Sequence, residues 1–190
     1  MKKLKVLAIV LGIMMTFGSM AYAAPYVDVV QSPTGFFVPD DSLKYSSPYY
    51  RWYGEDWSWQ HGAVAGTFSS AVLGISAFDV DAPSEVDEIW AKESGAWVML
   101  GTLAGATDVW AYTEFTLGTE FYDDIAAGLE VMIKIDTGTM GWWAVTLAKS
   151  ALSIDGGTPP GPEPGPVPEP ATLLLLGFGL AGLATLRKKF

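Results

Sequence analysis

Apolar and polar residues alternate along most of the middle of the chain. In the segment Leu129–Asp136, apolar residues occupy every second position, with charged residues or a methionine between them. A period of two residues is typical of a β-strand that buries one face and exposes the other. The segment Ala71–Val80 likewise places Leu73, Ile75 and Ala77 on one face. The pattern therefore predicts a body made of strands.

Clusters of Gly, Asp, Ser and Thr separate the strand-like segments at the spacing of a β-sandwich. We expect strands at Tyr26–Val30, Phe36–Val38, Val64–Phe68, Ala71–Val80, Glu88–Lys92, Ala96–Leu103, Trp110–Leu117, Leu129–Asp136 and Trp142–Ile154, the last with room for a break near Ala148. Only Phe121–Ala127 is expected to form a short helix. The predicted fold of residues 24–155 is one all-β domain, an antiparallel, jelly-roll-like β-sandwich.

The N-terminal 23 residues have the pattern of a signal peptide. Three lysines, at positions 2, 3 and 5, precede the apolar segment Val6–Phe17. Ala21 and Ala23 then supply the small residues that signal peptidase reads, and cleavage is expected after Ala23.

A second apolar run lies near the C-terminus. Residues 167–190 begin with a proline-rich break, continue with the 16 uncharged residues Ala171–Leu186, and end in Arg187, Lys188, Lys189 and Phe190. A helix of that length spans about 24 Å, against about 30 Å for the hydrocarbon core, so 171–186 is predicted to be a short transmembrane segment. The basic residues favour the cytoplasmic side of the inner membrane. Residues 156–166, rich in Pro and Gly, are expected to be an extended linker.

Pro168, Glu169 and Pro170, followed by the apolar run and the basic end, closely resemble the PEP-CTERM sorting signal of Gram-negative bacteria. The resemblance implies that an exosortase recognises these three residues and cleaves near them while the chain is transiently in the inner membrane. It also implies a final location in the cell envelope, at the cell surface or in the extracellular matrix of a biofilm. Residues 60–155 also resemble β-sandwich modules of such secreted proteins, which implies the fold but no ligand.

The net charge of residues 25–155 argues against one class of binding partner. Residues 25–155 contain five basic and 19 acidic residues, a net charge of −14. A field of that sign repels nucleic acid, so we expect no nucleic-acid binding. The chain has no cysteine, which excludes disulfides and thiolate metal sites.

An acidic loop is the first candidate site. Asp79 and Asp81 are two residues apart, so in an extended strand they point to the same side, about 6.6 Å apart. Glu85 and Asp87 could fold back across the turn at Pro83. Calcium prefers carboxylate oxygens, so these four residues are a candidate calcium site, with a solvated acidic hairpin as the alternative.

Residues 40–61 are dense in aromatic side chains, among them Trp52, Trp57 and Trp59. These three could stack on sugar rings, or they could fill one end of the sandwich. His61, the single histidine, has no nucleophile motif around it, which argues against an enzyme. We therefore expect a non-enzymatic surface or matrix protein, structural or associated with exopolysaccharide. The alternatives are a calcium-dependent carbohydrate-binding module and a glycoside-active enzyme.

Overall fold

The computed structural model of this protein describes residues 25–138 and 142–164. Its strands are β1 (Tyr26–Gln31), β2 (Arg51–Trp52), β3 (Trp57–Gln60), β4 (Ala71–Phe78), β5 (Glu88–Glu93), β6 (Ala96–Thr102), β7 (Trp110–Leu117), β8 (Glu130–Lys134) and β9 (Ala144–Ile154). Its helical elements are the 3-10 turns η1 (Asp41–Leu43) and η2 (Thr119–Phe121) and the short helix α2 (Tyr122–Ala127).

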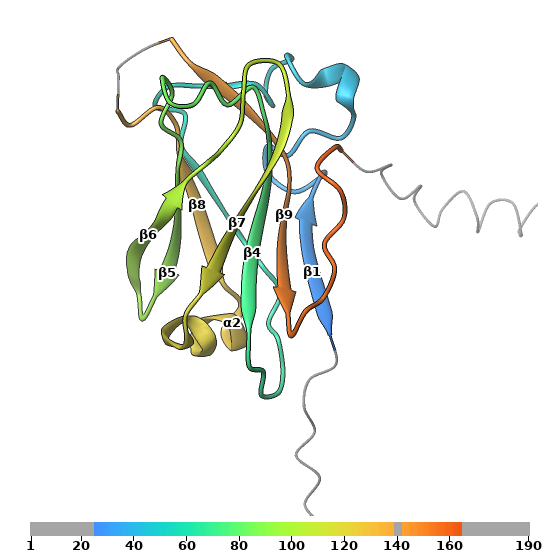
Figure 1. Cartoon of the computed structure of the whole chain (residues 1–190), viewed down its shortest axis with the longest axis vertical. Coiled ribbons are helices and arrows are strands. Elements are labelled where there is room, and N and C mark those ends of the chain that lie inside the picture. The colour runs from blue at the N-terminus through green and yellow to red at the C-terminus, as the bar shows by residue number, and fades with distance from the viewer. Residues whose placement is uncertain (1–24, 139–141, 165–190) are drawn as a thin grey trace, which may run out of the picture.

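The strands form two antiparallel sheets that face each other (Figure 1). One sheet has the order β1-β9-β4-β7, with β2 also paired to β9, and the other has the order β3-β8-β5-β6. With the two-residue β2 set aside, the hairpin pairs are nested: first with last, second with seventh, third with sixth, and fourth with fifth. This nesting is the eight-stranded jelly roll, so the predicted fold class is confirmed.

Most strands lie where the alternating pattern predicts them, and three differences are informative. Phe36–Val38 and Val64–Phe68 are not strands, although Phe37 and Val64 are buried. Their backbone groups make single hydrogen bonds to other elements instead. The Val38 N–H donates to the Leu147 carbonyl of β9 at 2.9 Å, and the Val64 N–H donates to the Ile125 carbonyl of α2 at 3.2 Å. Conversely, β3 lies inside the aromatic segment and was not expected. Strand β9 continues through Ala148, where its register against β4 shifts but the strand does not end.

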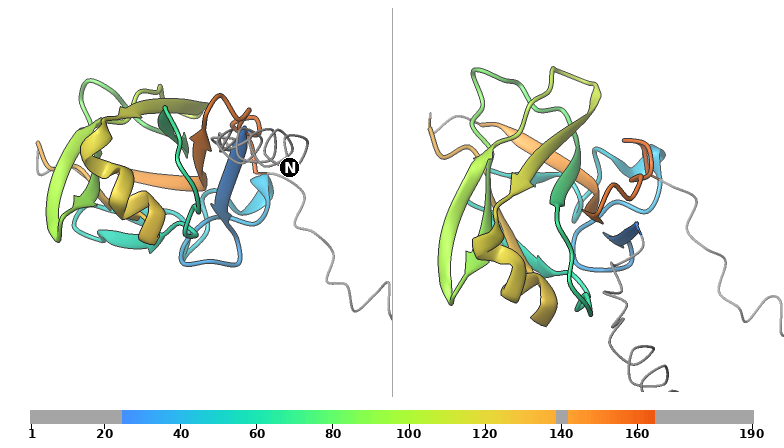
Figure 2. Two further views of the ribbon diagram at one scale, coloured as in Figure 1. Left: turned by 90° about the horizontal axis from the view of Figure 1, so that it is seen from below. Right: turned by 60° about the horizontal axis from the view of Figure 1, so that its bottom comes forward.

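The core lies between the sheets and is apolar. In β4 the residues at alternate positions, Leu73, Ile75 and Ala77, are fully buried, and Val131 and Ile133 of β8 face them from the other sheet. Each such aliphatic side chain contributes about 1.5–3 kcal/mol relative to exposure. Seen from below, α2 lies across the lower opening between the sheets (Figure 2), with Ile125 turned into the core.

The outer face of the β1-β9-β4-β7 sheet is also covered. Residues after β9 turn back and run beside β1 and β9 (Figure 1). The Ser76 hydroxyl donates to the Pro162 carbonyl, and Lys149 is buried beneath Pro160–Glu163. Within the expected linker, residues 160–163 therefore lie against the sheet, where the Ser76 hydroxyl supplies a hydrogen-bond donor. We call this segment the strap.

The expected signal peptide (1–23) and sorting signal (167–190) lie outside the described residues. Within residues 25–138 and 142–164, no helix is both long and apolar enough to cross a bilayer.

The strap contact predicts a stability change. Ser76→Ala should lower the free energy of unfolding by about 1 kcal/mol, because the Pro162 carbonyl loses a donor in a half-buried position. The loss corresponds to roughly 3 °C in thermal unfolding followed by circular dichroism. The matched control is Ser58→Ala, on the exposed face of β3. Equal melting temperatures for the two variants would mean that the strap contact does not stabilise the fold.

Candidate functional site

The loops at the end of the sandwich opposite α2 carry the candidate site (Figure 1). Strands β4, β6 and β8 end there, and β5, β7 and β9 begin there, because the ladders between them are antiparallel. The sequence-predicted acidic loop 79–87 connects β4 to β5 at this end. We call this region the loop end.

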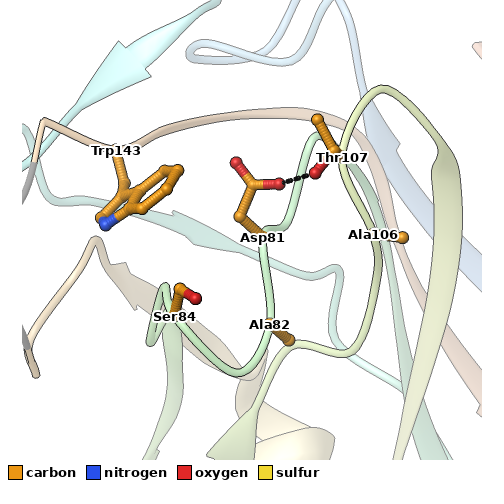
Figure 3. A pocket seen from close by; sticks show the side chains of 6 residues that line it. All are labelled: Asp81, Ala82, Ser84, Ala106, Thr107 and Trp143. Carbon is orange, nitrogen blue, oxygen red and sulfur yellow. Dashed lines mark hydrogen bonds between the residues drawn. The ribbon is translucent and has the colours of Figure 1, made fainter.

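A pocket of about 350 Å³ opens at the loop end (Figure 3). We call it the polar pocket. The Trp143 indole forms one side and faces the Asp81 carboxylate, while the Ser84 hydroxyl lies below them. The Thr107 hydroxyl donates to Oδ1 of Asp81. The residues that line the pocket are Asp81, Ala82, Ser84, Ala106, Thr107 and Trp143.

Backbone contacts hold the pocket walls in place. The Asp81 carbonyl accepts from the N–H groups of Ser84 at 2.9 Å and Glu85 at 3.0 Å, which closes a turn. Oε2 of Glu85 in return accepts from the Asp81 N–H at 2.9 Å. On the other side, Gly105 lies so near Val80 that a Cβ atom there would be 2.7 Å from the Val80 Cβ. The absence of a side chain at Gly105 therefore lets the two loops pack together.

The four predicted calcium ligands point to different partners. Asp79 is buried, and its two oxygens accept from the Tyr50 hydroxyl at 2.7 Å and the Asp108 N–H at 2.8 Å. Asp81 lines the polar pocket, whereas Glu85 and Asp87 lie in the interior. Among the described residues, no three carboxylate or imidazole groups are arranged to hold a metal ion. Calcium binding therefore remains a prediction from the sequence.

Glu85 and Asp87 form a buried acidic pair. Oδ1 of Asp87 accepts from the Asp136 N–H at 3.0 Å. Oδ2 of Asp87 and Oε1 of Glu85 have no hydrogen-bond partner among the described residues when both groups are ionised. Burial, followed by repulsion from Asp87, raises the pKa of Glu85, and burial also raises the pKa of Asp87. One carboxyl can then keep its proton and donate it in a hydrogen bond to the other carboxyl.

The three tryptophans proposed to stack on sugar rings differ in their exposure to solvent. Trp57 and Trp59 alternate on the inner face of β3, are 9% and 4% exposed, and contact Phe37 edge-on at ring distances of 4.7 and 5.3 Å. They are core residues, so the stacking role expected for them needs correction: their ring faces are already covered by protein. Trp52, by contrast, is 46% exposed.

The remaining sequence-predicted residues are not described by the structure. They are Ala21 and Ala23 of the signal peptide, Pro168, Glu169 and Pro170 of the sorting motif, and Arg187, Lys188 and Lys189 of the basic end. Sequence reasoning in turn missed Ser84, Thr107 and Trp143 as pocket residues. The adjacent pair Trp142-Trp143 was the available signal for the last of these.

The structure also brings together an aspartate, a histidine and a serine. Nδ1 of His61 is 2.8 Å from Oδ2 of Asp28, and Nε2 of His61 is 2.8 Å from the Ser150 hydroxyl. Hydrogen bonding to His61 is the main cause that lowers the pKa of Asp28. These contacts match a hydrolytic triad, but Ser150 is fully buried within β9. Because no substrate carbonyl can reach it, the arrangement is a structural link between the sheets.

The contacts of His61 predict that its removal destabilises the fold, and the burial of Ser150 predicts that this serine is unreactive. His61→Ala should lower the free energy of unfolding by about 2–4 kcal/mol, measured with denaturant, because Asp28 and Ser150 lose their shared partner. Ser58→Ala, on the exposed face of β3, is the control. A fluorophosphonate reagent should leave Ser150 unmodified. Labelling of Ser150 that disappears in His61→Ala would instead identify a hydrolase.

The buried acidic pair predicts that stability falls as pH rises. Both carboxyls bind protons more tightly in the folded state, so their stabilising contribution is complete below the ordinary carboxyl pKa near 4. It is then lost up to the raised pKa of Glu85, about 8. The free energy of unfolding should therefore be lower at pH 8 than at pH 5, as measured by denaturant titration. Asp87→Asn should flatten this dependence, whereas Asp123→Asn on exposed α2 should not. A flat profile for the unaltered protein would contradict the pairing.

Comparison with known proteins gives little information about the body of the chain. No curated protein matches the sequence. The structure is similar to the coat protein dimer of Tobacco streak virus, with 13% identity over 77% of this chain and 89% of that one, at a TM-score of 0.32. It is also similar to dimeric latent PorU from Porphyromonas gingivalis, with 11% identity over 72% of this chain and 13% of that one, at 0.33. Likenesses this distant support no functional argument.

The C-terminal region gives a specific match. A family model for the PEP-CTERM protein-sorting motif matches residues 166–189, which confirms the resemblance seen at Pro168, Glu169 and Pro170. The motif supports export of the protein to the cell envelope or surface, with an exosortase as the processing partner. The protein is therefore one that carries a PEP-CTERM sorting motif in its C-terminal region.

Proposed function

We propose that this protein is a non-enzymatic component of the cell surface or the extracellular matrix of a biofilm, and that it binds exopolysaccharide through the polar pocket. The observation that carries the proposal is the arrangement of Trp143 opposite Asp81 and Ser84 (Figure 3). A pyranose ring presents apolar C–H groups on its faces and hydroxyl groups at its edge. The indole suits the face, and the carboxylate and hydroxyl suit the edge.

The size and charge of the pocket favour a neutral sugar. A volume of about 350 Å³ is at the lower end of small-molecule sites and is of the order needed for a single sugar unit. The carboxylate of Asp81, on a body with a net charge of −14, disfavours uronic acids and sulfated polymers. A neutral polysaccharide would not be repelled.

Two alternatives have weaker support. A calcium-dependent module would use carboxylates at the loop end, and the two unpartnered oxygens of Glu85 and Asp87 are compatible with a cation displacing their proton. A glycosidase needs a pair of carboxyl groups on either side of the scissile bond. Among the described residues that line the polar pocket, Asp81 alone is acidic. This composition favours binding over hydrolysis.

The proposal predicts which variants lose polysaccharide binding. Trp143→Ala and Asp81→Asn should each weaken co-sedimentation with a neutral exopolysaccharide by about tenfold or more, because the first removes the indole wall of the polar pocket and the second replaces its carboxylate acceptor with an amide. Trp97→Ala, on β6 and outside that pocket, is the matched indole control and should bind normally. Unchanged binding in both pocket variants would refute the proposed contact, and release of reducing sugar would favour the enzyme.

The assignment of the sorting motif can be tested against a second copy of the same triplet in the chain. The chain contains two Pro-Glu-Pro triplets, Pro162-Glu163-Pro164 and Pro168-Glu169-Pro170, and the first ends in the strap region next to the sheet. Glu169→Gln should leave the C-terminal segment uncleaved and the protein in the inner membrane, detected by fractionation and a C-terminal tag. Glu163→Gln should be processed normally. The opposite result would move the recognition element to the first triplet.

A further inference from the structure

We propose that Trp52, Tyr53 and Trp142 form a second sugar-binding subsite next to the polar pocket, so that the loop end binds a chain of neutral pyranose units rather than one sugar. These three rings line a cavity of about 340 Å³, which we call the aromatic cup. This inference rests on the proposed function and extends it to an oligosaccharide.

The cup is exposed to a degree that packing does not explain. Trp142 is 92% exposed, Tyr53 is 50% exposed and Trp52 is 46% exposed. An exposed indole forgoes much of the free energy that burial of so large an apolar surface would contribute. Three such rings around one hollow therefore indicate a surface that is covered by a ligand.

Hydrogen bonds of the backbone hold in place the chain segments that carry the rings of the cup. Strand β2 pairs with the start of β9, with Trp52 opposite Ala144. The Tyr53 N–H donates to the Trp143 carbonyl at 3.1 Å, and the Trp52 N–H donates to Oε2 of Glu55 at 2.9 Å. The cup is thus assembled by the β2–β9 ladder, which positions its aromatic residues before any ligand arrives.

The cup and the polar pocket share one segment of chain. Trp142 lines the cup and Trp143 lines the polar pocket, and their Cα atoms are separated by one peptide unit, about 3.8 Å. The proposal is that a ligand with two or more linked rings spans this dipeptide and contacts both sites. The affinity of a longer oligosaccharide should exceed that of a single sugar, since the second contact is made intramolecularly.

The composition of the cup favours sugar over a protein partner. Among the described residues its lining consists of three aromatic rings and no aliphatic side chain, and two of the rings carry an N–H and one a hydroxyl at the edge. Rings of this kind offer an apolar face and a polar tip, which matches a pyranose. The acidic groups nearby, Glu55 beside Trp52 and Asp81 in the polar pocket, disfavour an anionic polymer.

The test compares oligosaccharides of different length on the full chain, purified in a detergent without a sugar headgroup. Calorimetry should give tighter binding for cellohexaose than for glucose, and little effect of salt. Trp142→Ala and Trp52→Ala should weaken cellohexaose binding about tenfold and reduce the advantage of the longer ligand. Trp97→Ala should change neither, and the melting temperatures of the cup variants should stay within about 2 °C of the parent because the rings are exposed.

The outcomes separate this inference from the proposed function. If Trp143→Ala and Asp81→Asn lose polysaccharide binding but Trp142→Ala and Trp52→Ala do not, the cup inference is overturned and the polar pocket stands. If the parent protein binds neither cellohexaose nor exopolysaccharide, the proposed function is refuted, and the cup inference that rests on it is refuted as well. Tighter binding of polygalacturonate than of cellohexaose would overturn the charge argument. Self-association lost in Trp142→Ala, with glycan binding intact, would assign the cup to a second copy of the chain.

Discussion

The structure depends on the position of β9 between β1 and β4. All eleven residues of β9 are buried, and its backbone pairs with β1 on one side and with β4 on the other. Through these ladders the last strand joins the first, which closes the nested pairing of the jelly roll. Neighbouring side chains of β9 point to opposite faces, so Ser150 meets His61 inside while Lys149 lies under the strap outside. A register shift against β4 follows between Lys149 and Leu147.

This closure also creates the loop end. Because the paired strands are antiparallel, segments far apart in the sequence leave the sheets on the same side, and the polar pocket combines residues 81–84, 106–107 and 143. The β2–β9 ladder adds Trp52 and Tyr53 to the same end. The opposite end is closed by α2 and Ile125 (Figure 2). The fold is therefore asymmetric, with one packed end and one end available for ligands.

The strap connects this architecture to sorting. Its carbonyl contact with Ser76 and its cover over Lys149 keep the chain on the sheet as far as Pro162–Glu163. A few residues then separate the strap from Pro168, where the sorting motif begins its Pro-Glu-Pro triplet. The motif supports delivery to the envelope or surface, and the loop end supplies the chemistry that we propose for the delivered domain.

The all-β class, most of the strands and the sorting motif were predictable from the sequence, because alternation, apolar runs and basic flanks are local properties. Which aromatic residues are exposed to a ligand depends on the tertiary structure. Trp57 and Trp52 have the same side chain, but Trp57 points from β3 into the core between the sheets, whereas Trp52 is half exposed on β2. It also placed Trp143 opposite Asp81, 62 residues away in sequence, and divided Asp79, Asp81, Glu85 and Asp87 among different partners. Such placements depend on which ladders close the sandwich, and no local pattern encodes that choice.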